Sequence, residues 1–296
     1  MNQIPEIICI GQAVVDCITR GAEEDPLGLG KTRAESITLN LGGDAVNESF
    51  VLAGLGHSVR LVCAVGNDVA GRFIRSEAAG RGVMTDGITA VPGLVTPVAD
   101  MFVKKDGSRS SVSSTAAMLP GYEPDPQLLQ GARIVSFASL FRAPLDRPEI
   151  IAKLVQTASE SGAVICADTK LPTWRRLGLA EIKDILPLID YLFPNEEEAA
   201  WYTGRKDLQG MADELHRLGI KHVVIKTGSE GCFGSGDGQS FAIPAGKVPV
   251  IDTTGAGDNF AAGFIDSLLQ GAGFRGSCEA GIARAAESVQ HVGAVR

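Results

Sequence analysis

The segment 251–265 contains the residue types best suited to chemistry, and it reads Ile-Asp-Thr-Thr-Gly-Ala-Gly-Asp-Asn-Phe-Ala-Ala-Gly-Phe-Ile. Apolar residues recur at helical spacing after it, so Gly255, Ala256 and Gly257 open a predicted helix. Glycine lets the backbone turn tightly beside a ligand, and the first N–H groups of a helix are unpaired donors at the positive end of its dipole. The pattern predicts a site for a small anion such as phosphate.

Asp258 lies in the first turn of that predicted helix. An acid at this position is ordinary in itself, because it stabilises the helix dipole or caps the helix. Beside a phosphate-sized group of donors, however, a carboxylate can accept the proton of a hydroxyl that attacks the phosphate. Such a base needs no strongly raised pKa, because little negative charge builds on the attacking oxygen in a loose transition state. The combination predicts phosphoryl transfer.

Two further charged residues follow predicted strands. Lys226 ends the apolar run 223–225, so it emerges at the carboxyl end of a strand, where α/β sheets bind ligands. Asp16 comes soon after the first predicted strand, and a carboxylate there can accept two hydroxyl groups through charge-assisted hydrogen bonds. The alternative for Asp16 is an ordinary acid in a turn.

The elements that must position these residues alternate along the chain. Strand-length apolar runs are predicted at 7–11, 59–65, 133–137, 163–168, 191–193 and 223–226. Helical patterns are predicted at 44–55, 70–81, 149–160, 196–202, 208–218, 260–270 and 278–290. This alternation predicts an α/β fold with a mostly parallel central sheet flanked by helices. Uninterrupted apolar strands indicate that helices cover both faces of the sheet.

The segments 13–39 and 96–116 do not follow this alternation. In the second, the strand-like runs 98–104 and 109–113 flank Asp106-Gly107, a strong hairpin signal. We expect both segments to supply short strands to a small β-sheet lid, so that residues 1–296 form one domain with a lid. The open edges of such a sheet favour a homodimer formed through the lid.

Composition excludes several classes of protein. The 296-residue chain has a net charge of −8 and no Lys/Arg blocks, which does not fit nucleic-acid binding. Its apolar runs are shorter than the roughly 20 residues that a membrane span needs, and residues 1–6 lack the pattern of a signal peptide. The six cysteines show no C-x-x-C spacing. We therefore expect a cytoplasmic protein with reduced thiols, without zinc and without membrane partners.

Two familiar nucleotide-binding patterns are rejected. Residues 25–32 approximate a P-loop, but the first glycine is replaced by Asp25 and no strand leads into the segment. Gly255-Ala256-Gly257 lacks the third glycine of a dinucleotide-binding fingerprint, since Phe260 occupies that position. A dehydrogenase is therefore disfavoured.

Five elements, in order, resemble motifs of the PfkB (ribokinase-like) carbohydrate kinases. Residues 252–260, Asp-Thr-Thr-Gly-Ala-Gly-Asp-Asn-Phe, are similar to the C-terminal signature of that family, and 41–47, Leu-Gly-Gly-Asp-Ala-Val-Asn, are similar to its G-G-x-x-x-N element. The other three are Gly11 with Asp16, the N-x-x-E-like segment 194–198, and the K/T-x-G-like loop 226–231. The resemblance implies a ribokinase-like fold and a sugar kinase.

The resemblance also implies roles for individual residues. Asp258 would be the base that takes the proton from a sugar hydroxyl. The amides of Gly255, Ala256 and Gly257 would steady the transferring phosphoryl group. The residues implied to bind the sugar are Asp16, Gly42, Gly43 and Asn47.

On the nucleotide side, the resemblance implies ATP and Mg²⁺. The implied ATP contacts are Asn195, Lys226, Thr227, Gly228, Gly231 and Gly293. Asn195 and Glu198 would hold Mg²⁺ through water, which suits an ion that dehydrates reluctantly. The ordinary alternative for this pair is a solvated helix start. Asp252 matches a position where some members bind a monovalent cation, and dependence on K⁺ is left open.

The sequence as a whole predicts an ATP- and Mg²⁺-dependent kinase that phosphorylates a primary hydroxyl of a sugar or sugar acid, with a lid that excludes water. Lys104, Arg109 and Arg142 are candidates for an anionic substrate group, although exposed charges are the commoner explanation. One alternative is a nucleoside kinase of the same fold, which the few aromatic residues of the lid segments disfavour. The other is a non-catalytic sugar-binding regulator.

Overall fold

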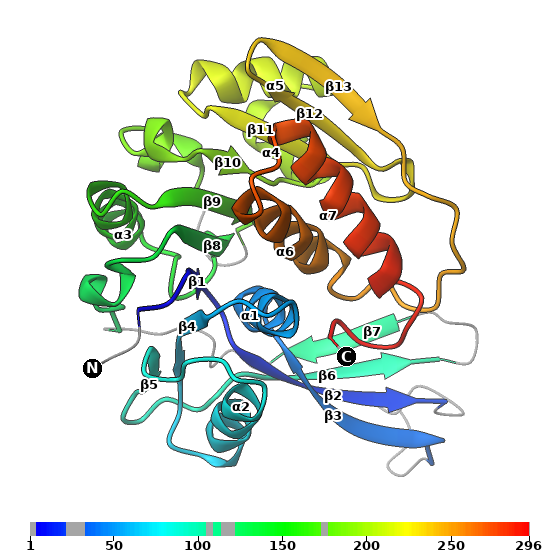
Figure 1. Cartoon of the computed structure of the whole chain (residues 1–296). Helices are drawn as coiled ribbons and strands as arrows, with labels where there is room; N and C mark the ends of the chain where they lie inside the picture. The colour runs from blue at the N-terminus through cyan, green and yellow to red at the C-terminus, as the bar shows by residue number, and fades with distance from the viewer. Residues whose placement is uncertain (1–3, 22–32, 105–108, 114–121, 173–176, 296) are drawn as a thin grey trace.

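The computed structural model describes residues 4–21, 33–104, 109–113, 122–172 and 177–295, and these form two β-sheets with helices around the larger one (Figure 1). The larger sheet has nine strands in the order β13-β12-β11-β10-β9-β8-β1-β4-β5. Its strands are β1 (Ile7–Ile10), β4 (Val59–Val65), β5 (Ile88–Ala90), β8 (Ile134–Leu140), β9 (Val164–Thr169), β10 (Tyr191–Leu192), β11 (His222–Lys226), β12 (Cys232–Gly236) and β13 (Gln239–Ile243). Pairing is parallel from β5 to β11, which confirms the predicted fold class.

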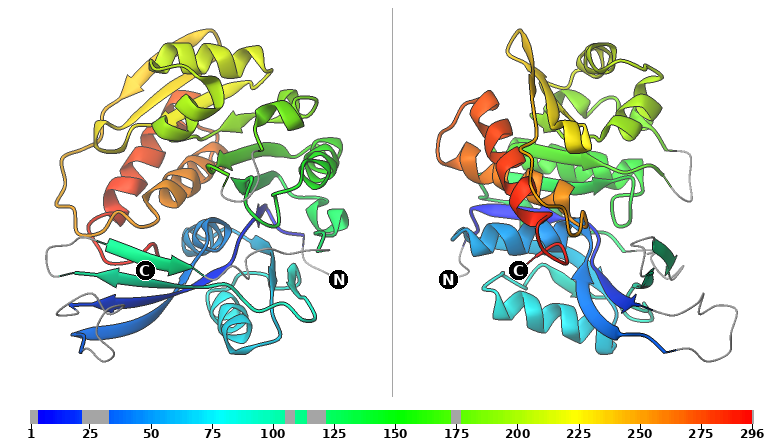
Figure 2. Two further views of the ribbon diagram at one scale, coloured as in Figure 1. Left: turned by 180° about the vertical axis from the view of Figure 1, so that it is seen from behind. Right: turned by 90° about the vertical axis from the view of Figure 1, so that its right-hand side faces the viewer.

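Helices cover both faces of this sheet (Figures 1 and 2). One face packs against α1 (Asp44–Gly54), α2 (Val69–Gly80), α6 (Ala256–Leu269) and α7 (Phe274–Ser288). The other packs against α3 (Pro148–Glu160), α4 (Glu196–Thr203) and α5 (Leu208–Arg217). Because neither face meets water, every residue of β1, β4 and β8 is buried. This burial explains why those strands are continuous in apolar residues rather than alternating.

The last helix begins four residues before its predicted start at residue 278. Gly273 precedes the observed start and Gly276 lies in the first turn, so the helical pattern is interrupted there. Two other glycines let α6 and α7 approach closely. A Cβ at Gly263 would lie 2.7 Å from Cβ of Arg284, and a Cβ at Gly281 would lie 2.9 Å from the carbonyl oxygen of Phe260. Glycine lowers helix propensity, so local preference concealed a helix that tertiary packing stabilises.

The antiparallel edge formed by β12 and β13 was not predicted. β12 pairs antiparallel with both β11 and β13, and residues 237 and 238 connect β12 to β13. Asp237 and Gly238 have φ values of 52° and 72°, the left-handed conformation that two-residue hairpins require. Asp237-Gly238 is therefore the same hairpin signal as Asp106-Gly107, from which the lid hairpin was predicted.

The smaller sheet confirms the predicted lid. Its order is β3-β2-β6-β7, formed by β2 (Val14–Arg20), β3 (Ser36–Gly42), β6 (Val98–Val103) and β7 (Arg109–Ser113). It projects from the end of the larger sheet that lies near the C-terminal tail (Figures 1 and 2). Asp106-Gly107, the P-loop-like segment 25–32 and the end of the predicted lid at 114–116 lie outside the described residues.

The remaining composition-based expectations concern cysteine pairing and the membrane. All six cysteines are free, and five of them are buried. Within the ranges that the structure describes, no helix combines the length and the apolar character needed to span a bilayer.

Gly43, which precedes α1, offers a test of the local geometry. Its φ is 94°, and a Cβ there would lie 2.3 Å from the carbonyl oxygen of Gln12. We expect Gly43→Ala to lower the free energy of unfolding by at least about 1–3 kcal/mol, the cost of a strained backbone conformation. Gly54 ends the same helix with open space around it, so Gly54→Ala should be neutral or stabilising. Thermal unfolding measures both, and equal losses would contradict this geometry.

Candidate active site

The N-terminus of α6 forms the predicted anion site. Gly255 is the N-cap with a φ of 72°, and the first amide that bonds back within the helix is that of Asn259, which donates to the carbonyl oxygen of Gly255 at 2.9 Å. No described residue accepts a hydrogen bond from the amides of Gly255 or Gly257. The amide of Ala256 makes a long bond of 3.3 Å to the carbonyl oxygen of Thr253, with which a ligand would compete. This helix end therefore offers donors to an anion.

Asp258 lies directly beside these donors and is only 5% exposed. Its Oδ2 accepts a hydrogen bond of 2.6 Å from Nδ2 of Asn47 on α1. Burial and then the negative charge of Asp44 raise the pKa of Asp258 to about 7, although Lys170 and the hydrogen bond from Asn47 act in the opposite direction. The carboxyl group is thus poised to gain or lose a proton near neutral pH, although the proposed chemistry did not require a raised pKa.

The predicted sugar-binding residues lie around the start of α1. Gly43 caps α1, whose first turns carry Asn47 towards Asp258. Gly42 touches the lid residue Asp16 so closely that a Cβ there would lie 2.2 Å from Oδ2 of Asp16. Burial raises the pKa of Asp16 to about 6. The Oδ1 atom of Asn47 is buried and has no partner among the described residues, so it can accept a hydrogen bond from a ligand hydroxyl.

A chain of charges that the sequence analysis missed connects the two ends of the site. Lys226 pairs with Asp168, and Lys170 lies 3.3 Å from Oδ2 of Asp44. Burial would lower the pKa of Lys170, but the nearby acids outweigh it and raise that pKa. Asp168 and Lys170 lie at the carboxyl end of β9. Lys226 was identified by its place at the end of a strand, and the same signal was present for these two residues.

Lys226 also lies next to the anion site, because its Nζ would be 3.3 Å from a Cβ placed on Gly257. A cation at this distance from the start of α6 adds to the positive potential of the helix end. The structure therefore brings together the predicted catalytic helix and the predicted nucleotide-side strand.

Asn195 and Glu198 form a reciprocal cap at the start of α4. Oδ1 of Asn195 accepts from the Glu198 amide at 2.8 Å, and Oε2 of Glu198 accepts from the Asn195 amide at 2.9 Å. Glu198 also accepts from Oγ1 of Thr169 at 3.1 Å and is only 4% exposed. Burial and then the charge of Asp168 raise its pKa. The pair is thus a buried helix cap beside Lys226, with which Asn195 forms a β-bridge, rather than a solvated helix start.

The loop after β11 places the remaining nucleotide-side residues. The amide of Thr227 donates to the carbonyl oxygen of Gly231 at 2.9 Å, and Gly228 has a φ of 60°. Gly231 has a φ of 105°, and a Cβ there would lie 1.9 Å from the carbonyl oxygen of Ile243. The tight turn between β11 and β12 therefore requires glycine at 231 whether or not a nucleotide binds.

Asp252 and Asn259 connect the loop before α6 to the C-terminal tail. Oδ1 of Asp252 accepts from the amide and the hydroxyl of Thr254 at 2.9 and 2.7 Å, and its Oδ2 accepts from the amide of Gly293 at 3.1 Å. Nδ2 of Asn259 donates to the carbonyl oxygens of Gly255 and Ala294 at 2.9 and 2.8 Å. The tail is therefore part of the support of the anion site, and sequence reasoning had missed Asn259.

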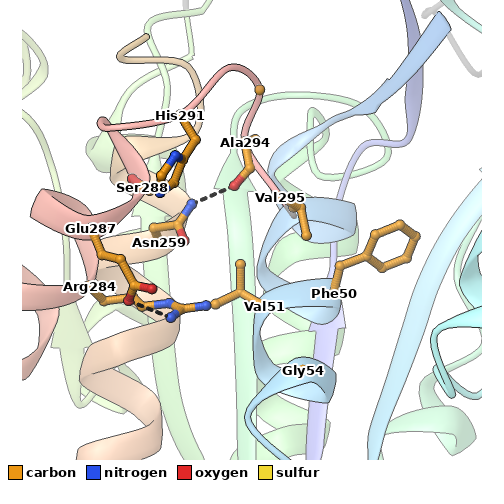
Figure 3. A pocket seen from close by; sticks show the side chains of 11 residues that line it. Phe50, Val51, Gly54, Asn259, Arg284, Glu287, Ser288, His291, Ala294 and Val295 are labelled. Carbon is orange, nitrogen blue, oxygen red and sulfur yellow. Dashed lines mark hydrogen bonds and ion pairs between the residues drawn. The ribbon is translucent and has the colours of Figure 1, made fainter. Parts of the chain in front are cut away.

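A cavity of about 230 Å³ adjoins this tail. Figure 3 shows Asn259 reaching across to Ala294 at its edge. The cavity lies between α1, α6 and α7, and Gly293 contributes to its wall. The cavity is lined by Phe50, Val51, Gly54, Asn259, Arg284, Glu287, Ser288, His291, Gly293, Ala294 and Val295. Asn259 therefore lines this cavity and also bonds Gly255 at the start of α6.

Comparison with known proteins identifies the family. Residues 5–296 match the pattern of the pfkB family carbohydrate kinases. The chain belongs to this family. It is 30% identical over 263 residues to a ribokinase of Haemophilus influenzae, covering 86% of this chain and 82% of that protein. A cytidine kinase of Thermococcus kodakarensis is 26% identical over 258 residues, covering 85% of this chain and 88% of that protein.

The pfkB fold is also confirmed by a solved structure. The ribokinase of Arabidopsis thaliana, solved in complex with ribose and ATP, superposes with a TM-score of 0.82 at 24% identity, covering 98% of this chain and 94% of that one. This pfkB-family chain therefore has the ribokinase-like α/β fold, and it is a phosphotransferase that acts on an alcohol group.

The charges around Asp258 predict how activity depends on pH. The resemblance implies that Asp258 acts as a base in its carboxylate form, and its pKa is about 7, so kcat/KM should fall as pH drops below about 7. Asp44→Asn removes a charge that raises this pKa, so the acid limb should move to lower pH. Lys170→Met removes a charge that lowers it, so the limb should move to higher pH. Profiles of kcat/KM against pH for the three proteins measure these shifts, and movement in one common direction would contradict the assignment.

Proposed function

We propose that the protein transfers the γ-phosphoryl group of ATP to a primary hydroxyl of a sugar or sugar acid. The observation that carries this proposal is the bond of 2.6 Å between Asn47 and Asp258 at the N-terminus of α6. This bond supports the proposal because it joins the side-chain amide of Asn47 to Asp258 beside the first amides of α6. Acceptor alcohol, proton acceptor and phosphoryl group would then meet at a single point.

In the proposed reaction the acceptor sugar lies between the lid and α1. Asp16 and Oδ1 of Asn47 accept hydrogen bonds from sugar hydroxyls, and Asp258 accepts the proton of the attacking hydroxyl. The free amides at the start of α6 and the ammonium group of Lys226 stabilise the negative charge of the transferring phosphoryl group. Each well-aimed donor of this kind contributes about 3–4 kcal/mol in a water-poor site.

The nucleotide phosphates would lie between the start of α6 and the loop that follows β11. Asn195 and Glu198 fit a Mg²⁺ held through water, because they lie beside Lys226 and magnesium keeps several of its waters. In the described part of the chain no three His, Cys, Asp or Glu side chains form a metal-binding group by themselves. Bound Mg²⁺ supplies charge neutralisation on the nucleotide phosphates. A monovalent cation at Asp252 stays a prediction.

A sugar is favoured over a nucleoside by the inner face of the lid. Phe102 is the one aromatic residue in the described lid strands, and it is paired in register with Thr19. Side chains alternate along a strand, so Phe102 and Thr19 lie on the face opposite to Asp16. An aromatic wall for a nucleobase is therefore lacking on the described inner face. The intact anion site with Asp258 disfavours a non-catalytic regulator.

Release of ADP in a coupled assay with sugars, sugar acids and nucleosides tests the proposed function. We expect turnover with a sugar or sugar acid, and at least about a thousandfold loss of kcat in Asp258→Asn with nucleotide binding retained. Asp213→Asn on α5 is the matched control, since Asp213 is exposed and on another helix. If ADP is released only in the presence of nucleosides, the nucleoside-kinase alternative holds. If ADP is released with none of the acceptors, the kinase proposal fails.

We also propose that the lid forms a homodimer. Exposed apolar side chains on its outer strands support this, because Ile37 and Leu39 are 66% and 60% exposed and Val112 is 49% exposed. The strand register pairs Leu39 with Cys17, Cys17 with Asp100, and Asp100 with Val112, so these residues share one face. That face is opposite to Asp16, so a second copy can cover it without blocking the site.

Leu39→Lys should convert such a dimer to monomers, because it places a charge in the apolar interface. Val69→Lys is the control, since Val69 is 74% exposed at the start of α2 and is not part of the lid strands. Light scattering coupled to gel filtration measures the mass of both variants and of the unmodified protein. If the unmodified protein is monomeric at all concentrations, the proposed homodimer is disproved.

A further inference from the structure

A lid strand touches the loop that supports the anion site. Arg20 is the last residue of β2, and its Nη2 atom lies 3.7 Å from Oδ2 of Asp252. The side chain of Asp252 is only 5% exposed and that of Arg20 is 34% exposed. Water therefore screens this pair less than it screens an exposed ion pair.

Asp252 is more than a partner for Arg20, because it organises the loop that ends in Gly255. Its Oδ1 fixes the amide and hydroxyl of Thr254, and its Oδ2 fixes the tail through the amide of Gly293. A cation beside Oδ2 therefore acts on a carboxylate whose position determines where Gly255 stands. The anion donors of α6 begin at that residue.

The same strand carries the proposed sugar ligand. Asp16 and Arg20 are four residues apart on β2, so they point to the same face of the lid and are separated by about 13 Å. Asn40, which pairs in register with Asp16, also approaches the tail: its Nδ2 atom would lie 3.8 Å from a Cβ on Gly293. A sugar that holds Asp16 thus fixes a strand whose far end contacts the support of the anion site.

We propose that Arg20 is a positioning residue that couples the placement of the lid over the sugar to the geometry of the anion site, acting through Asp252. The inference rests on the proposed sugar-kinase function. When the sugar fixes β2, Arg20 holds Asp252, and Asp252 holds Thr254 and Gly293 so that the start of α6 is correctly shaped for the phosphoryl group. Without the sugar, this restraint on the loop is weaker, which disfavours transfer to water.

Replacement of Arg20 should therefore change kcat more than it changes sugar binding. We expect Arg20→Gln to lower kcat on the order of tenfold or more, while KM for the sugar changes by less than about threefold. Arg20→Lys should recover part of kcat because it keeps the charge. Arg33→Gln is the matched control, since Arg33 is an exposed arginine just before the next lid strand, β3. An unchanged kcat in Arg20→Gln, or a loss confined to KM, would overturn the inference.

A double-mutant cycle tests whether Arg20 acts through Asp252. Asp252→Asn alone should lower kcat, and adding Arg20→Gln in that background should lower it by less than about twofold more. Losses that multiply fully would show that Arg20 acts independently and would overturn the proposal. If Asp258→Asn abolishes the kinase activity, the proposed function holds whatever the Arg20 variants show. If the unmodified protein is inactive towards every acceptor, both proposals are overturned.

Discussion

The hydrogen bond between Asn47 and Asp258 connects the beginnings of two helices, α1 and α6, that are 211 residues apart in the chain. It holds a buried carboxyl group where the amides of α6 point, in a region that also contains Asp44, Asp168 and Glu198. Lys170 and Lys226 offset only part of this negative charge. Burial and acid-rich surroundings therefore raise the pKa of Asp258, which places its titration near neutral pH.

This arrangement has a cost in stability. A carboxyl group whose pKa rises on folding binds more protons in the folded state between its unfolded pKa, 3.8, and its folded pKa, about 7. Its contribution to stability is therefore complete below that range and is lost as pH rises through it. The same raised pKa that suits Asp258 to the proposed role of base makes the ionised site unfavourable for the fold. The surrounding buried sheet, helix caps and loop-to-tail hydrogen bonds hold the group there nevertheless.

Much of the fold could be predicted from local signals. Apolar runs located most strands of the parallel sheet, and Asp106-Gly107 indicated the lid hairpin even though that turn lies outside the described residues. The start of α7 was placed four residues late, because Gly273 and Gly276 interrupt the helical pattern at the point where α7 begins. The residues of the candidate site could be proposed from sequence where one segment carries them, as at residues 255–258. Asp44, Lys170 and Arg20 were missed because their roles depend on partners far away in the sequence.

Direct titration of the Asp258 carboxyl group tests whether this buried group changes protonation near neutral pH. In protein labelled with ¹³C-aspartate, its carboxyl resonance can be assigned by its absence from the Asp258→Asn spectrum and followed by NMR against pH. We expect the Asp258 carboxyl group to titrate with an apparent pKa of about 7 in the absence of ligands. A resonance that shows Asp258 fully ionised down to pH 5 would contradict a buried carboxyl group poised among acids.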